Sequence, residues 1–165
     1  MKAIVAVDEN WAIGNQGELL VSIPEDQKGV FRAHTLDHTV VFGRKTLETF
    51  PKQMLLPRRK NLIMSRNSSF AKEGAEIIHS NEALFAYSKA HPDEEIFVIG
   101  GAEVYRGLID FCDEAIVTRI HHSFAADAYF PKLCDDTAWS LKERTATQYS
   151  VIGMAFHVEK YIRNK

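Results

Sequence analysis

The chain has 165 residues, of which 45% are hydrophobic and 25% are charged, and its net charge is −2. This length and composition are typical of one globular domain, which we expect to span residues 1–165. The charge argues against a nucleic-acid-binding protein, because such a protein needs a strong positive field.

The N-terminal apolar run covers only residues 3–7 and is followed by Asp8. It is too short for a signal peptide or a membrane span, so we expect a cytoplasmic protein with no membrane partner. Cys112 and Cys134 lack the spacing of metal ligands, and we expect both to be packing thiols in a reducing compartment. We expect no metal site and a monomeric protein.

Apolar runs bounded by polar or turn residues predict strands at 2–8, 38–42, 60–64, 75–78, 95–99 and 114–118. Two segments between these strands have helix patterns. Residues 24–34 open with a proline and two acids, and residues 81–91 follow a Ser-Asn cap. Strands that alternate with helices predict an α/β domain with a mostly parallel sheet covered on both faces.

The C-terminal part has a different pattern. Residues 139–149 and 153–163 predict two long strands joined by a turn, which form an antiparallel hairpin at the end of the sheet. Residues 9–23 have no regular pattern, and we expect a long loop that closes over a ligand.

Two glycines follow a buried strand in the segment VIGGAEVY (98–105), and a helix pattern begins directly after them. Ligands of parallel sheets bind outside the carboxyl ends of the strands, where free N–H groups at a helix start bind phosphate. Gly100 and Gly101 would let a pyrophosphate approach the backbone. A tight turn for close packing of strand and helix explains the same pair.

A second strand, at 38–42, also ends at a glycine and a helix start, here with Arg44, Lys45 and Thr46. The glycine spacing matches neither the Walker phosphate loop nor the Rossmann motif, so a nucleotide would be held in another way. Further basic residues flank the strand at 60–64, with Arg59 before it and Arg66 after it. A solvated basic surface is the simpler explanation for any one of these residues alone.

Seven segments together resemble the dihydrofolate reductase family in order and spacing, and most closely its bacterial members: 11–20, 23–27, 42–51, 55–61, 98–105, 116–122 and 127–131. The resemblance implies a single-domain α/β fold with a mostly parallel eight-stranded sheet, flanking helices and the C-terminal antiparallel hairpin. It also implies that 7,8-dihydrofolate is reduced by hydride transfer from NADPH, which supplies tetrahydrofolate to one-carbon metabolism.

The resemblance further implies which residues bind NADPH. The pyrophosphate would meet the two glycine-containing helix starts, and the 2′-phosphate of the adenosine ribose would meet Ser65 and Arg66. A guanidinium suits a phosphate because it offers fixed paired donors and a charge. The implied cofactor-binding residues are Ala6, Ile13, Gly14, Gly43, Arg44, Lys45, Thr46, Ser65, Arg66, Ile99, Gly100, Gly101, Ala102, Val104 and Tyr105.

On the substrate side, the resemblance assigns the catalytic carboxylate to Asp26, which would accept two hydrogen bonds from the pterin edge. Arg59 would bind the α-carboxylate of the substrate's glutamate. The implied substrate-binding residues are Ile4, Ala6, Asp26, Phe31, Phe50, Leu56, Arg59 and Thr118. An acid favoured by the dipole of the first helical turn is the alternative explanation for Asp26, and ordinary core packing is the alternative for the apolar residues.

The departures from the family lie near the pterin. Leu20 and Val21 replace the usual Pro and Trp, and Gln27 follows the acid where an apolar residue is usual. The interval from Asp26 to Gly43 is one residue longer than in bacterial members, so an alternative register places Gln27 at the position of the acid. The last segment includes Asp127, which could hydrogen-bond the 9–23 loop.

Two other functions fit parts of the same pattern. A reductase of a riboflavin-precursor pyrimidine would share the NADPH half but lack the pairing of Asp26 with Arg59. A binding module that keeps the cleft without useful turnover would explain the departures at Val21 and Gln27.

Overall fold

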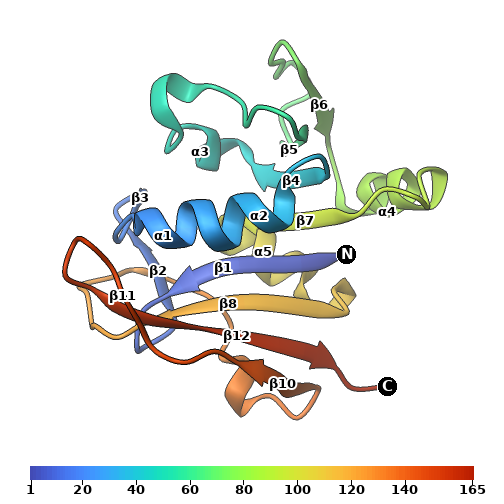
Figure 1. The fold of residues 1–165 in the computed structure, drawn as a ribbon. Coiled ribbons are helices and arrows are strands. Elements are labelled where there is room, and N and C mark those ends of the chain that lie inside the picture. Colours follow the sequence, from blue (N-terminus) through green and yellow to red (C-terminus); the bar gives the residue numbers. More distant parts are fainter.

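A sheet with the strand order β10-β12-β8-β1-β7-β4-β5-β6 forms the centre of the computed structural model, which describes residues 1–165 (Figure 1). Its strands are β1 (Lys2–Val7), β4 (Thr39–Gly43), β5 (Lys60–Met64), β6 (Ala75–Ile78), β7 (Ile96–Gly100), β8 (Glu114–Ile120), β10 (Trp139–Arg144) and β12 (Ala155–Arg163). All pairs from β8 through β6 are parallel, whereas β12 pairs antiparallel with β8 and β10. The predicted fold class and all six predicted strands are confirmed.

The expected C-terminal hairpin is also present, although its first strand is interrupted. Both β10 and β11 (Gln148–Tyr149) pair with β12, and the register of β10 shifts between Leu141 and Glu143. The predicted continuous strand over 139–149 is therefore wrong between residues 144 and 148. The β10 side chains after Trp139 are exposed, so no buried face enforces one unbroken register.

Helices lie on both faces of the sheet, with α1 and α2 in front of it and α5 behind it in Figure 1. The helical segments are α1 (Pro24–Asp26), a π turn (Gln27–Arg32), α2 (Ala33–Thr35), α3 (Arg44–Leu47), α4 (Asn81–Ala90) and α5 (Ala102–Leu108), with 3-10 turns at Pro51–Gln53, Ile109–Phe111 and Leu133–Asp135. The predicted cap of α4 is present, because Ser80 Oγ accepts a hydrogen bond of 3.0 Å from Ala83 N.

The helix predicted at 24–34 is continuous but not uniformly α-helical. Its middle, Gln27–Arg32, is a π turn, which contains one more residue than an α-helical turn. A π turn at this place accommodates the extra residue that the resemblance implies between Asp26 and Gly43. The chain on either side keeps its α-helical conformation.

Side chains of the central strands alternate between two cores. Ile4, Val40 and Ile116 pack in the core on the side of α1 and α3, together with Phe31. Val5 and Val41 point to the opposite core, beside α4 and α5. Both faces of these strands are buried, which explains their nearly continuous apolar sequences.

Residues 12–19 form a hairpin, so the expected irregular loop over 9–23 is wrong for this part of the segment. β2 (Ala12–Asn15) and β3 (Glu18–Leu19) form a hairpin, and β9 (Ala128–Tyr129) pairs with β2 to complete a small second sheet. The hairpin turn has positive φ at Gln16 and Gly17, which suits a two-residue turn. Strands of two to four residues give no readable alternation in the sequence.

A buried charged cluster, which we define as Arg119, His157, Glu159 and Tyr161, joins β8 to β12. Glu159 accepts hydrogen bonds from Arg119 at 3.1 Å, from His157 at 2.9 Å and from Tyr161 at 2.5 Å. The Arg119 guanidinium lies 4.4 Å from the ring of Trp11, at the start of the 9–23 segment. Burial alone would raise the pKa of Glu159, but these donors lower it overall.

Both cysteines are free thiols. Cys112 is buried, and burial raises the pKa of its thiol to about 12, in agreement with the expected packing role. Cys134 is exposed, so the packing interpretation is wrong there. No helix has the length and apolar character needed to cross a membrane, and no group of three or more His, Cys, Asp or Glu side chains is arranged to hold a metal ion.

Candidate functional site

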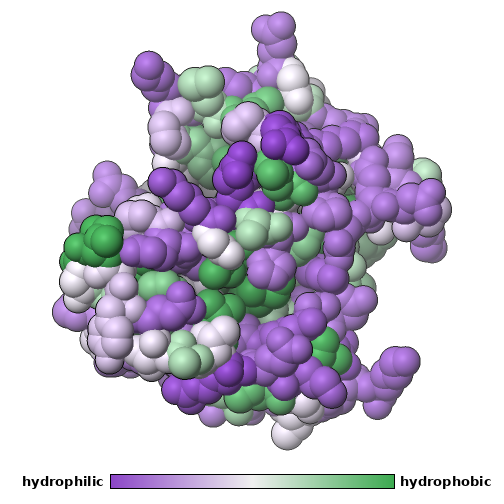
Figure 2. Space-filling model, viewed as in Figure 1, coloured by the Kyte–Doolittle hydropathy of each residue, from purple (hydrophilic) through white to green (hydrophobic).

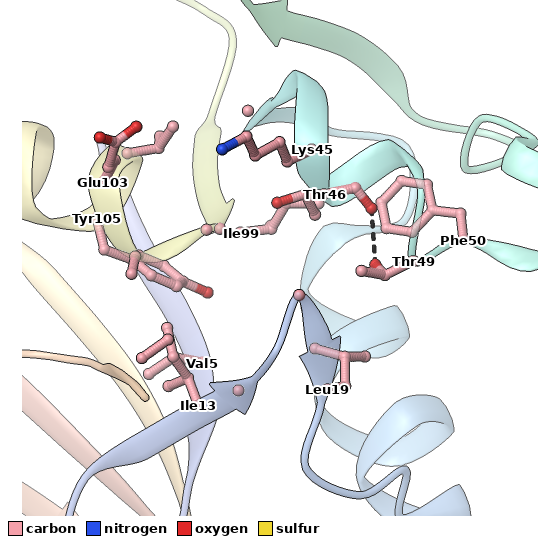
Figure 3. Close-up of a pocket in the computed structure, with 18 of the residues that line it drawn as sticks. Val5, Ile13, Leu19, Lys45, Thr46, Thr49, Phe50, Ile99, Glu103 and Tyr105 are labelled. Atoms are coloured by element: carbon pink, nitrogen blue, oxygen red, sulfur yellow. Dashed lines mark hydrogen bonds between the residues drawn. The ribbon is translucent and has the colours of Figure 1, made fainter. Parts of the chain in front are cut away.

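One cleft of about 1450 Å³ opens at the carboxyl ends of the parallel strands. The two glycine-containing helix starts and the N-terminal hairpin surround it, so that Lys45 and Thr46 from α3 face Ile99 and Tyr105 across the opening (Figure 3). Every residue predicted from the sequence for cofactor or substrate lines this cleft except Arg59. Segments separated by more than 100 residues in the chain thus meet in one site.

The glycines bring the starts of α3 and α5 close together. A Cβ atom on Gly43 would lie 3.1 Å from Val104 Cγ2, and one on Gly101 would lie 3.3 Å from Thr46 Oγ1. Gly100 has a φ of +139°, which L-residues rarely adopt, and the Gly100–Gly101 peptide bond is cis. Close packing and access of a ligand to the backbone both require glycine here, so the two explanations of this turn are compatible.

Three positive side chains that are free or only loosely paired line the cleft. Lys45 and Arg66 form no ion pair, and Arg44 has only a loose one, 3.9 Å from Glu48. Ser65 is buried, and its carbonyl oxygen lies 2.8 Å from Nδ1 of His79. These groups offer an anion several donors that the protein itself does not use.

Tyr105 contributes both to the cleft and to the hydrophobic core. The ring lines the cleft beside Ile13 and Val5 (Figure 3), and the side chain belongs to the core shared with α4. Its hydroxyl donates a hydrogen bond of 2.7 Å to the carbonyl oxygen of Ile4. Burial raises the pKa of this hydroxyl, so it stays a donor.

The N-terminal hairpin forms one wall of the cleft and is held by the chain near β9. Gln16 N donates a hydrogen bond of 3.0 Å to the Asp127 carboxylate, and Asp127 N donates one of 3.1 Å to Gly14 O. The hydrogen bond expected between Asp127 and this segment is confirmed. Its geometry fixes the turn of the hairpin over the cleft.

Asp26 is the buried acid at the other end of the cleft. Its side chain is 7% exposed, and Thr118 Oγ1 donates a hydrogen bond of 2.5 Å to its Oδ1. Burial raises the pKa of this carboxyl, and the Thr118 hydrogen bond opposes the rise. A buried acid without a cation is costly, so its position needs a functional reason. Gln27, the position of the acid in the alternative register, is exposed and also lines the cleft.

Arg59 stands at the rim of the cleft beyond Phe31, outside the residues that line it. Its guanidinium donates to Thr35 Oγ1 at 3.2 Å and to Pro57 O at 2.9 Å, and it lies 6.0 Å from the Phe31 ring centre. Burial, with a smaller contribution from the charge of Arg32, lowers the pKa of Arg59. No carboxylate of the protein pairs with it.

Comparison with known proteins identifies the family. The family model for dihydrofolate reductase matches residues 1–163. Dihydrofolate reductase of Neisseria meningitidis serogroup A is 35% identical over 160 residues, which cover 97% of this chain and 96% of the relative. That of Staphylococcus haemolyticus is 31% identical over 163 residues, covering 97% and 95%. The chain belongs to the dihydrofolate reductase family.

A solved structure of the same family gives the same result in three dimensions. Dihydrofolate reductase from Enterococcus faecalis, complexed with NADP(H) and RAB-propyl, superimposes with a TM-score of 0.88 at 33% identity, over 99% of this chain and 96% of that one. The cleft described above fits such a dinucleotide, because its glycines leave the backbone open and two of its cations, Lys45 and Arg66, form no ion pair.

Several residues that line the cleft of this protein were not predicted from the sequence. His79, Ser80 and Asn81 line it at the junction of β6 and α4, next to Ser65 and Arg66. The rule that pointed to the glycine turns could have found them, because β6 is parallel to β5 and ends at the same edge. Thr49 was also missed, and its hydroxyl donates to Thr46 O at 2.7 Å (Figure 3).

Proposed function

We propose that the protein reduces 7,8-dihydrofolate to 5,6,7,8-tetrahydrofolate with NADPH, by the residues that the sequence singled out. The observation that carries this proposal is the buried Asp26–Thr118 pair, which shares one cleft with the glycine turns and cations suited to a dinucleotide. An uncharged pocket would bind a ring, but the acid selects one with paired N–H donors.

In this proposal, NADPH supplies the hydride, and the glycine turns with Arg44, Lys45 and Thr46 hold its pyrophosphate. Ser65 and Arg66 bind the 2′-phosphate. Ile13, Gly14 and Tyr105 surround the nicotinamide and exclude water from it. Alignment of the two reacting rings is the main contribution of these residues.

Asp26 accepts two hydrogen bonds from the pterin and polarises it, and Thr118 fixes the carboxylate in position. Because the carboxylate binds the edge of the ring remote from N5, water delivers the proton to N5 while the hydride goes to C6. Phe31, Phe50 and Leu56 enclose the benzoyl ring. Arg59 binds the glutamate α-carboxylate where the ligand leaves the cleft, consistent with its place at the rim.

We also propose that residues 1–165 work as one domain and as a monomer, in the cytoplasm and without nucleic acid. One sheet containing strands from both ends of the chain supports the single domain. The net charge of −2 supports the absence of nucleic acid. Sedimentation of the purified protein would test its oligomeric state.

The decisive assay follows NADPH oxidation with dihydrofolate, with and without a 2,4-diaminopyrimidine antifolate. We expect oxidation that depends on dihydrofolate and stops with the antifolate. Oxidation only with a riboflavin-precursor pyrimidine would support the other reductase. Tight binding of both ligands without turnover would support the binding module and overturn the proposed function.

A further inference from the structure

Gln27 is a polar residue of the cleft wall whose role neither the fold nor the proposed reaction explains. Its side chain lines the cleft, is exposed and has no hydrogen-bond partner within the protein. It directly follows Asp26 and precedes Phe31 by about one helical turn, and both of these residues line the same cleft.

The π turn is what brings these three residues to one wall. In a regular α-helix, residues five apart point about 140° away from each other, so Asp26 and Phe31 could not both face the cleft. The wider turn at Gln27–Arg32 brings them to the same side. Gln27 lines the same cleft as these two residues, and Arg59 lies beside Phe31.

Two hydroxyl groups of the cleft wall already have partners. Thr118 donates to Asp26, and Thr49 donates to the carbonyl oxygen of Thr46. The remaining wall consists largely of apolar side chains, namely Leu20, Val21, Phe31, Phe50 and Leu56. Gln27 thus adds an uncommitted primary amide, with donors and an acceptor, to an otherwise apolar passage.

We propose that Gln27 is a specificity-determining residue that binds the linking amide of the substrate's p-aminobenzoylglutamate tail. This inference rests on the proposed function. A ligand anchored at Asp26 and extending to Arg59 must pass Gln27, and its polar group between those two ends is a secondary amide. One N–H and one C=O of that amide match the carbonyl and the NH₂ group of Gln27 in a reciprocal pair.

A consequence concerns ligands that lack this amide. An apolar inhibitor cannot pair with Gln27, so its binding displaces water from the side chain without replacing the hydrogen bonds. The residue therefore favours the long substrate over compact apolar ligands. Selectivity of this kind comes from a polar group left without a partner in the wrong complex.

The test compares Gln27→Met with the parent protein on three substrates. Dihydrofolate has the linking amide, dihydropteroate ends in a carboxylate instead, and 6-methyl-7,8-dihydropterin has no tail. Lys28→Met is the matched control, because Lys28 is exposed on the same turn but does not line the cleft. Thermal unfolding of both variants establishes that they are folded.

We expect Gln27→Met to raise KM for dihydrofolate about three- to tenfold, the loss of one neutral hydrogen bond. KM for dihydropteroate and for the tailless pterin should stay within about twofold, and a 2,4-diamino-5-benzylpyrimidine should inhibit the variant as well as or better than the parent. Lys28→Met should behave as the parent on all ligands.

Equal changes for dihydrofolate and dihydropteroate would overturn the assignment to the linking amide, as would an unchanged KM for dihydrofolate. If Gln27→Met does not fold, Gln27→Leu replaces it in the same comparison. Failure of the proposed function would appear as a parent protein inactive on dihydrofolate. Failure of this inference would appear as an active parent whose selectivity does not depend on residue 27.

Discussion

At the Asp26 carboxyl, stability and function oppose each other. Burial raises its pKa, so the folded protein binds the proton more tightly than the unfolded chain does. The ionised form therefore lowers the free energy of unfolding once the pH is above the ordinary pKa of an aspartate. In the proposed function, this cost is offset because the carboxylate binds the pterin.

We predict that Asp26→Asn lowers kcat by about 10²-fold or more at neutral pH, because the charge that polarises the pterin is lost. The remaining activity should rise as the pH falls, since solvent then protonates dihydrofolate. The melting temperature at neutral pH should rise above that of the parent, and this difference should vanish in acid. Steady-state kinetics and calorimetry across pH measure both. If Asp26→Asn left kcat unchanged, the catalytic carboxylate would have to be another residue.

Charge at the adenosine end of the cleft should decide between NADPH and NADH. Replacing Arg66 with Ala should weaken NADPH binding by about 2 kcal/mol, on the scale of charged hydrogen bonds, and leave NADH binding nearly unchanged, because only NADPH carries the 2′-phosphate. Fluorescence titration with each cofactor measures the effect. Arg58→Ala serves as the control, because Arg58 pairs with Asp37 away from the cleft. Equal losses for both cofactors would contradict this assignment.

At the scale of the elements, the π turn predicts that one residue can be deleted from this helix without loss of the cleft wall. Deleting Gly29 leaves three residues between Asp26 and Phe31, so that the two are four positions apart, as residues on one side of an α-helix are, and the cleft wall should survive. We expect the deletion to keep most of the activity. A Cβ on Gly29 would meet no atom within 4 Å, so this position makes no packing contact that the deletion could remove.

The control is deletion of Ala86 from α4. It lies between the buried Leu84 and Tyr87, so its removal rotates one of them out of the core. We expect a loss of several kcal/mol of stability there, as for other buried side chains. Thermal unfolding and turnover of the two deletion variants measure the contrast. Similar losses of stability and turnover in the two deletion variants would contradict our account of the π turn.

Strands and helices were predictable where their own residues contain a recognisable apolar run or cap. The runs at β4, β5 and β7 are apolar on both faces, and Ser80 is a local cap for α4. The pairing of β2 with β9 was not predictable, because it joins very short strands more than a hundred residues apart. The π turn has no local signature, and only the length of the interval after Asp26 indicated it.

The same distinction applies to the site. Residues at strand ends, such as Gly100, could be chosen because parallel topology fixes where strands end. The position of Arg59 at the rim depends on the Thr35 and Pro57 contacts, which no motif contains. That Gln27 has no hydrogen-bond partner within the protein could not be predicted either, because it depends on side chains that only the tertiary structure brings near it.

For the whole molecule, the charged cluster of Arg119, His157, Glu159 and Tyr161 should set the response to acid. Burial lowers the pKa of His157, and the donors around Glu159 lower its pKa. As the pH falls, the unfolded chain therefore binds protons before the folded one does. Stability should decline from about pH 6.5 through His157, and below about 4.5 through Glu159.

We predict that Glu159→Gln costs about 3 kcal/mol at neutral pH, because Arg119 loses its partner, and flattens the decline below pH 4.5. His157→Gln should instead flatten the decline of stability that begins near pH 6.5. Urea unfolding of both variants at several pH values separates the two contributions. A parent protein equally stable at pH 4 and 7 would rule out this role for the cluster.

The π turn has a consequence for how genes of this family can diverge. An added codon inside a helix normally rotates every later side chain by about 100° and shifts the strand that follows. Here the surplus residue bulges within Gln27–Arg32, so Thr35 still reaches Arg59 and β4 still begins in register with β5. A wall of the ligand cleft can thus gain a residue and change its chemistry at position 27 without a compensating mutation elsewhere.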